Sequence, residues 1–293
     1  MGDLAPIPVL LDTDLGGDID DALALAVCLN HPRLDLRGVV TVHGDTELRA
    51  AQVRYLLALS GRGPLPVAAG SRDPLDGHAP LDRSYQAQAD VLPPHEEERW
   101  REGRADGVRL LAELALANPG ATLLAIGPLT NVARLRLEFP AAFAGLGRLA
   151  IMGGHRREDL SYPEYNFSCD PRAAQVVLAG GKSILLVGLD VTLRCRMTAA
   201  DVAHVAGGGT PLSSALTEMI RLWQGPEGVA LPVLHDPLAA LALAEPEVLA
   251  TEPQTLRVDD QGWCLPMEGP PNVEFAVEVQ EAQAVASTVA LLR

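Results

Sequence analysis

The sequence is short of cysteines and has no long hydrophobic run, and both shortages exclude classes of protein. The 293 residues contain only four cysteines, with no CxxC pair and no neighbouring histidine pair, which argues against a zinc site or a disulfide framework. No apolar stretch reaches the ~18 residues that a membrane span needs, and the N-terminus lacks the basic start and apolar core of a secretory signal. We therefore expect a cytoplasmic protein with reduced, mostly buried thiols.

Basic residues are also scarce. The chain has 38 acidic and 23 basic side chains, and its formal net charge is -15. A charge of this sign repels the phosphates of nucleic acids and the anionic surfaces of membranes. Neither a nucleic acid nor a membrane is expected as a partner.

Short apolar segments alternate with longer helix-like stretches along the chain. Such alternation predicts βαβ units and a mainly parallel, Rossmann-like open α/β sheet flanked by helices, with roughly seven or eight strands. No linker or internal repeat interrupts the pattern, so one domain over residues 1–293 is the simplest interpretation. The apolar segments are residues 9–11, 36–42, 65–69, 122–126, 148–152 and 183–187.

Unusual polar or glycine-rich groups follow these segments directly. In open α/β sheets the ligand crevice lies outside the carboxyl ends of the strands, so groups that are far apart in sequence should meet there. This placement predicts a single site, over which a helical portion at residues 198–244 should close. The groups are Asp12 and Asp14, His43-Gly44-Asp45, Gly127-Pro128, Gly153-Gly154, and Asp190.

The first of these groups begins a stretch of ten residues, 12–21, that contains five aspartates. Carboxylates this close repel one another unless a cation joins them, and oxygen ligands suit Ca²⁺ or Mg²⁺. The alternative is a solvated turn that caps a helix, since aspartate favours both positions. A cap needs only one or two acids, so we favour the metal site.

Two later segments could join this site. Residues 162–171 set polar side chains among aromatic ones, a composition that suits a sugar. His235-Asp236-Pro237 precedes an apolar helical pattern, in which Asp236 could be an N-cap with Pro237 at the first helical position. The adjacent imidazole of His235 instead favours an acid-base role beside a metal ligand.

The opening stretch partly matches two other motifs. An EF-hand loop that starts at Asp12 would place Gly17 at its sixth position but Leu23 where the bidentate glutamate belongs, so it does not match. A haloacid-dehalogenase-type phosphatase also begins with Asp-x-Asp after a strand. This chain continues instead with Gly16-Gly17 and has very little lysine, so that class is a less favoured alternative.

Taken together, the motifs resemble the inosine-uridine-preferring nucleoside hydrolase family, and the resemblance extends over most of the chain. Four blocks match in order, of which the first and last are the most specific. The blocks are the aspartate-rich opening with Ala22-Leu23-Ala24-Leu25, Ile126-Gly127-Pro128-Leu129-Thr130-Asn131, Met152-Gly153-Gly154 with Glu164-Tyr165-Asn166-Phe167 and Asp170-Pro171, and His235-Asp236-Pro237-Leu238.

The resemblance implies a Ca²⁺-dependent hydrolase that splits the N-glycosidic bond of ribonucleosides into ribose and free base. The reaction would use a metal-activated water and an oxocarbenium-like transition state, in purine or pyrimidine salvage. A homo-oligomer, either a dimer or a tetramer, is also expected. By position, the resemblance makes Asp14, Asp21, Asp236 and the carbonyl of Ile126 the metal ligands, and Asp14 also the base that deprotonates the water. Asp20, Glu164 and Asn166 would bind the ribose hydroxyls. Met152 would lie against the sugar, and His235 would lie on the leaving-group side.

The sequence departs from the family pattern in three places. The opening is two residues longer than the family's shortest form, so either Asp18 or Asp20 could take the sugar-binding role. Asp45 stands where many members have asparagine. The family's base-contacting loop is not recognisable between residues 76 and 106, where His78 or His95 could substitute, and base preference is not predicted.

A second class of function keeps the same metal and sugar residues. A non-catalytic, Ca²⁺-dependent ribose or nucleoside binder would retain them but would lose water activation or leaving-group protonation. The chain has both Asp14 and His235, and this favours the enzyme over the binder.

Overall fold

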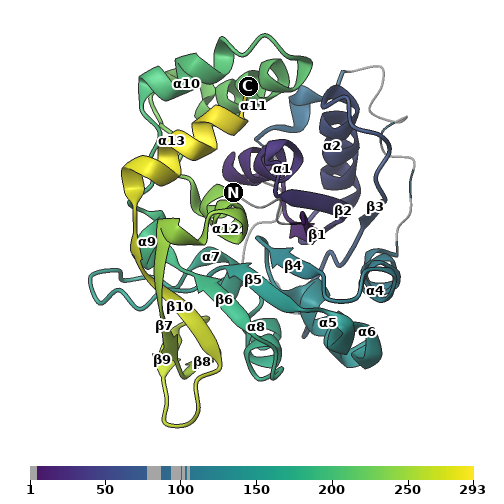
Figure 1. The fold of residues 1–293 in the computed structure, drawn as a ribbon, viewed down its shortest axis with the longest axis vertical. Helices are drawn as coiled ribbons and strands as arrows, with labels where there is room; N and C mark the ends of the chain where they lie inside the picture. The colour runs from purple at the N-terminus through teal and green to yellow at the C-terminus, as the bar shows by residue number, and fades with distance from the viewer. Residues whose placement is uncertain (1–4, 78–86, 94–99, 101–102, 104–105) are drawn as a thin grey trace.

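The computed structural model describes residues 5–77, 87–93, 100, 103 and 106–293. Within them, eight strands form one sheet in the order β3-β2-β1-β4-β5-β6-β10-β7 (Figure 1). All neighbouring pairs are parallel except β10 and β7. The strands are β1 (Ile7–Thr13), β2 (Leu34–Thr41), β3 (Val67–Ala69), β4 (Thr122–Ala125), β5 (Arg148–Met152), β6 (Ile184–Val187), β7 (Leu249–Gln254) and β10 (Val273–Val279), and a separate hairpin pairs β8 (Leu256–Val258) with β9 (Cys264–Pro266).

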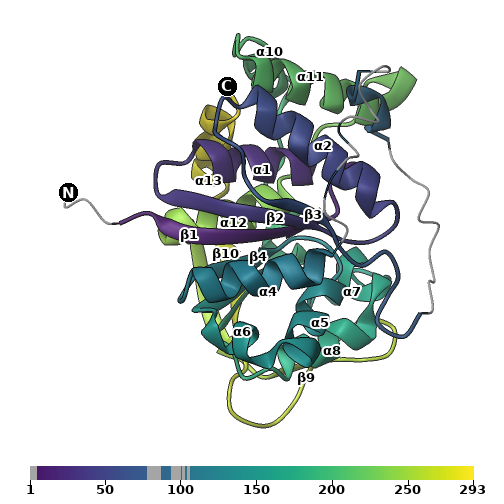
Figure 2. The same cartoon turned by 90° about the vertical axis from the view of Figure 1, so that its right-hand side faces the viewer.

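Helices cover both faces of the sheet (Figure 2). One face carries α1 (Asp20–Asn30), α2 (Thr46–Leu59), α10 (Ala199–Ala206), α11 (Pro211–Gln224), α12 (His235–Ala244) and α13 (Glu281–Leu291). The other carries α4 (Gly107–Ala117), α5 (Thr130–Glu138), α6 (Pro140–Gly145) and α8 (Pro171–Leu178). The shorter helices are α7 (Tyr165–Cys169), α9 (Leu189–Thr192), η1 (Ala89–Val91), η2 (Gly225–Glu227) and η3 (Pro246–Val248).

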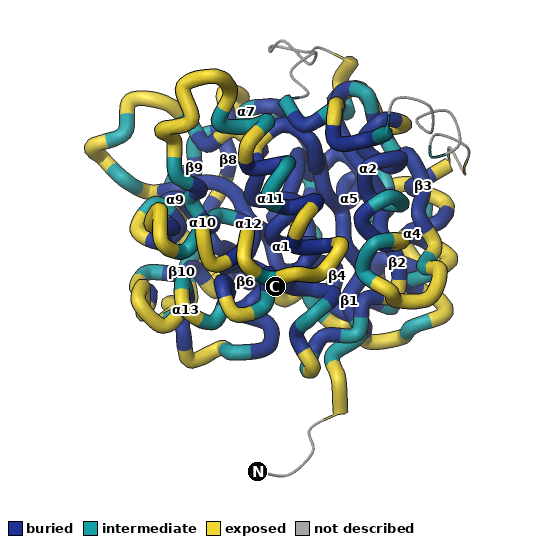
Figure 3. The backbone as a smooth tube through the Cα atoms, turned by 90° about the horizontal axis from the view of Figure 1, so that it is seen from above, coloured by how far each residue is buried: buried dark blue, intermediate teal, exposed yellow. Residues whose placement is uncertain are grey.

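The core lies between the sheet and these two helical layers, and the backbone of the central strands is buried (Figure 3). The strands β4 and β6 are buried at every residue, as expected for parallel strands with helices on both faces. Helix α1 is also buried on every side from Asp20 to Leu29 because it packs against α12, α11 and α13 as well as β2. This burial carries the acidic start of α1 into the interior.

The predicted fold class is confirmed, and each of the six apolar segments overlaps a strand. The sequence did not locate the strands after residue 244, among which β7 is mostly exposed and lacks a continuous apolar run. The four cysteines are free and buried, as predicted. Among the described residues, no helix has the length and apolar character to cross a membrane.

Candidate functional site

A cavity of about 680 Å³ opens at the carboxyl ends of the central strands, where the polar groups were predicted to meet. Strand β5, helices α1, α2, α7, α9 and α12, the loop after β1 and the segments that follow β4 and precede α7 all contribute to its wall. From the predicted helical portion at 198–244, His235 and Asp236 border it. The lining residues are Asp14, Gly17, Asp18, Asp20, Asp21, Arg49, Ile126, Met152, Tyr162, Pro163, Glu164, Tyr165, Asn166, Ser168, Leu189, Leu193, His235 and Asp236.

The loop between β1 and α1 is held by hydrogen bonds from two side chains, those of Gln88 and Arg49. Gly16 adopts φ 115°, a backbone conformation that suits glycine. The buried amide of Gln88 donates to the carbonyls of Gly17 and Asp18, at 3.1 and 2.6 Å. Arg49 donates to the carbonyl of Leu15 at 2.9 Å. The loop is therefore held in one conformation at the cavity wall.

The five aspartates of this opening have separate surroundings. Asp12 lies in the core, where Asn131 donates to it at 2.7 Å and burial raises its pKa to about 8. Asp18 is exposed, whereas Asp14, Asp20 and Asp21 are buried beside the cavity.

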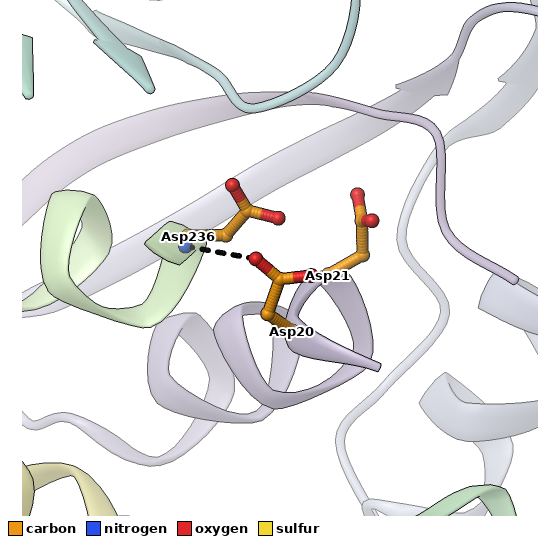
Figure 4. A group of neighbouring side chains, drawn as sticks. All are labelled: Asp20, Asp21 and Asp236. Carbon is orange, nitrogen blue, oxygen red and sulfur yellow. Dashed lines mark hydrogen bonds between the residues drawn. The ribbon is translucent and has the colours of Figure 1, made fainter. Parts of the chain in front are cut away.

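Three of the buried carboxylates form a compact group (Figure 4). Asp20, Asp21 and Asp236 each place an oxygen within 4.8 Å of the others. The backbone N–H of Asp236 donates to Oδ2 of Asp20 at 3.3 Å, which joins the starts of α1 and α12. Asp14 lies beside this group, and its backbone N–H donates to Oδ1 of Asp21 at 3.2 Å. Thr13 also donates to Oδ1 of Asp21.

The negative charges of these three carboxylates repel one another. Burial, and then the negative charge of neighbouring aspartates, raise the pKa of Asp20, Asp21 and Asp236 well above the ordinary value. A divalent cation among them would relieve both the repulsion and the loss of solvation. Carboxylate oxygens are the donors that Ca²⁺ and Mg²⁺ prefer, so the residues present fit such an ion.

Asn166 and Ile126 lie in direct contact. Nδ2 of Asn166 donates to the carbonyl of Ile126 at 2.9 Å and to the carbonyl of Met152 at 3.3 Å. Asn166 does not cap the helix that follows, because the N-cap of α8 is Asp170, which accepts from the N–H of Ala173.

Glu164 is the N-cap of α7. Its Oε1 accepts from the N–H of Asn166 at 2.7 Å, and its Oε2 accepts from Gly154 and Phe167 at 2.9 and 3.0 Å. These bonds fix the carboxylate at the cavity wall. Burial raises its pKa, and the backbone donors offset part of that effect.

His235 is the first residue of α12. The N-cap is Leu234, so the alternative in which Asp236 caps this helix with Pro237 at its first position is wrong. Nδ1 of His235 lies 2.7 Å from Oγ1 of Thr192 in α9. Burial, and then the positive charge of Arg196, lower the pKa of the imidazole to about 4, so it is neutral near pH 7.

Several cavity residues were not identified from the sequence. Arg49 and Gln88 are polar residues within buried surroundings, but a single sequence does not show which buried face a side chain meets. Asp45 caps α2 by accepting from the N–H of Leu48, and it does not line the cavity. His78 and His95 lie outside the described residues. Tyr162 and Tyr165 line the cavity, as expected for the segment 162–171, whereas Leu189 and Leu193 were not predicted.

Comparisons with known proteins identify a family that this chain matches over most of its length. A family model for inosine-uridine preferring nucleoside hydrolases matches residues 9–286. The pyrimidine-specific ribonucleoside hydrolase RihA of Enterobacter sp. (strain 638) is 32% identical over 269 residues, which cover 87% of this chain and 85% of RihA. Uridine nucleosidase 1 of Arabidopsis thaliana is 31% identical, over 88% of this chain and 80% of its own length.

A solved structure supports the fold. An inosine-uridine preferring nucleoside hydrolase from Bacillus anthracis matches with a TM-score of 0.80 at 23% identity, over 98% of this chain and 99% of that one. The family match includes all four sequence blocks that carried the resemblance and excludes the haloacid-dehalogenase alternative. This chain therefore belongs to the inosine-uridine preferring nucleoside hydrolase family.

Proposed function

We propose that the protein hydrolyses the N-glycosidic bond of ribonucleosides in a Ca²⁺-dependent reaction that yields ribose and free base. The observation that carries this proposal is the buried group of Asp20, Asp21 and Asp236 in the wall of a cavity of about 680 Å³. Such a group needs a cation, and the cavity is large enough for a nucleoside.

Asp14, Asp21, Asp236 and the carbonyl of Ile126 would hold the ion. Asp14 lies next to Asp21, and the Ile126 carbonyl has a second lone pair beside the one that Asn166 uses. When bound, Ca²⁺ would supply positive charge that acidifies a water molecule and attracts vicinal hydroxyls. Hard oxygen donors support Ca²⁺ over softer metals.

Asp20, Glu164 and Asn166 would bind the ribose hydroxyls. The Glu164 carboxylate is fixed by three backbone donors and still has acceptor capacity for a hydroxyl. The thioether of Met152, which borders the same cavity, would pack on the sugar. Negative charge around the ring would stabilise the positive charge that develops as the glycosidic bond breaks.

Asp14 and His235 would serve opposite sides of the reaction. Asp14 would take the proton of the attacking water, and His235 would donate to the departing base. If Thr192 donates to Nδ1 of His235, the neutral ring carries its proton on Nε2, which leaves a donor available. The relatives that act on pyrimidine nucleosides support the inclusion of uridine among the substrates.

A ribose-release assay tests this proposal. The protein is incubated with a panel of purine and pyrimidine ribonucleosides, with Ca²⁺ or with a chelator, and reducing sugar is measured. Ca²⁺-dependent release of ribose supports the hydrolase. Saturable nucleoside binding without release would instead identify a binding protein, and release that survives complete chelation would refute the metal requirement.

A further inference from the structure

Arg49 introduces a fixed positive charge into a cavity that is otherwise acidic. The residue lies in the first turn of α2, is 2% exposed and borders the cavity together with Asp14 and Tyr165. Burial raises the pKa of Asp14, Asp21 and Tyr165, and the positive charge of Arg49 offsets part of that rise. Burying a guanidinium costs free energy unless its N–H groups have hydrogen-bond partners.

Two backbone carbonyls hold the guanidinium in place. Nε donates to the carbonyl of His43 at 2.7 Å, and Nη1 donates to the carbonyl of Leu15 at 2.9 Å. His43 has φ 66°, an uncommon conformation for a residue with a side chain. The loop after β2 thus keeps a strained residue at the point where its carbonyl meets Arg49.

The third nitrogen of the guanidinium is not used in this way. Across the part of the chain that the structure describes, Nη2 has no hydrogen-bond partner, and no carboxylate forms an ion pair with Arg49. Nη2 is also absent from the polar atoms that are both unpartnered and shut off from solvent. A charged donor at the cavity wall is therefore left for a ligand.

The chemistry of a ribonucleoside restricts what this donor can bind. Guanidinium only donates hydrogen bonds, and it has no capacity to accept them. In the proposed function the ribose hydroxyls would face Asp20 and Glu164, whose carboxylates would accept from them. The base offers the stronger acceptors, namely the keto oxygens of uracil or hypoxanthine.

We propose that Arg49 binds a keto oxygen of the nucleobase and stabilises the negative charge that the base gains as it leaves. This inference rests on the proposed hydrolysis of ribonucleosides. As the C1′–N bond breaks, its electron pair passes to the base and is delocalised onto the keto oxygens. The hydrogen bond from Arg49 is therefore stronger in the transition state than in the bound substrate, which accelerates the reaction. Arg49 thereby favours keto-bearing bases.

The test compares two substrates that share ribose and differ in the leaving group. Uridine releases a base that needs stabilisation, whereas p-nitrophenyl riboside releases a phenolate that is stable without it. In Arg49→Gln we expect kcat/KM for uridine to fall by about 10²-fold, as when one donor to a developing anion is removed. The loss with p-nitrophenyl riboside should be several-fold at most. 5-Fluorouridine, whose base is more acidic, should lie between them.

Two controls separate this role from a structural one. Arg54→Gln removes a half-buried arginine on the same helix that also donates to backbone carbonyls, at Trp100 and Val67, and it should leave both substrates nearly unchanged. Melting temperature and Ca²⁺ affinity, measured on each variant, report whether the loop at Leu15 keeps its conformation. If Arg49→Gln does not fold, Arg49→Lys takes its place, and the loss should again be at least several-fold larger for uridine.

Equal losses on uridine and p-nitrophenyl riboside, or no loss on either, would overturn the role of Arg49 while the wild-type protein still releases ribose. If the wild-type protein releases ribose from neither substrate in the presence of Ca²⁺, the proposed function itself fails. The two failures are thus distinguished by the wild-type measurement alone.

Discussion

Replacing Asp21 by asparagine tests the metal site most directly. Asparagine keeps an oxygen that can accept from Thr13 and from the N–H of Asp14, so the local hydrogen bonds survive. It removes one negative charge from the group formed with Asp20 and Asp236. The metal-free variant should therefore melt at a higher temperature than the metal-free wild type, because one buried repulsion is relieved.

Ca²⁺ should stabilise the wild-type protein but not the Asp21→Asn variant. At a free concentration of one hundred times Kd, binding to the folded state stabilises the wild-type protein by about 2.7 kcal/mol. For a chain of 293 residues, an unfolding entropy of roughly 2.1 cal/mol/K per residue means that about 0.6 kcal/mol of added stability raises the melting temperature by one degree. The melting temperature of the wild type should thus rise by about 4 °C, and that of Asp21→Asn should not change.

The assay is a thermal melt with a chelator and with increasing Ca²⁺, accompanied by ribose release. Asp35→Asn is the matched control, because Asp35 lies at the amino end of β2, away from the cavity at the carboxyl ends, and pairs with the exposed Arg37. It should keep the full Ca²⁺ response and full activity. A Ca²⁺-dependent shift of the same size in Asp21→Asn would refute the assignment of Asp21 as a ligand.

Three further predictions concern other parts of the site. Burial and mutual repulsion raise the pKa of the clustered carboxyls, so cation binding must displace protons, and the Kd for Ca²⁺ measured by calorimetry should increase as the pH is lowered; a pH-independent Kd would contradict this. Asn166→Ala should lower kcat/KM for ribonucleosides by roughly 1 to 3 kcal/mol in transition-state stabilisation, and unchanged kinetics with a lower melting temperature would show a structural role only. His235→Ala should slow uridine by ~10² to 10⁴-fold but p-nitrophenyl riboside much less, and equal losses would make His235 a support for Asp236 instead.

The sequence by itself determined the central strands and the positions of the polar groups after them. Runs such as residues 148–152 are local signals, since a parallel strand with helices on both faces must be apolar along its length. The rule that ligands bind at the carboxyl ends of such strands then predicted that Asp14 lies near Gly127-Pro128 and Gly153-Gly154, and the family resemblance added Met152 and Asn166.

Only the tertiary structure decided which acids share a cation-sized space and which donors face the cavity. Sequence spacing could not place Asp20 with Asp236, because that contact joins the starts of two helices more than two hundred residues apart. It also could not reveal Arg49, whose position depends on carbonyls of Leu15 and His43 that two separate loops supply. A side chain's function depends on what its neighbours leave unsatisfied, and those neighbours are brought together by the packing of the whole sheet.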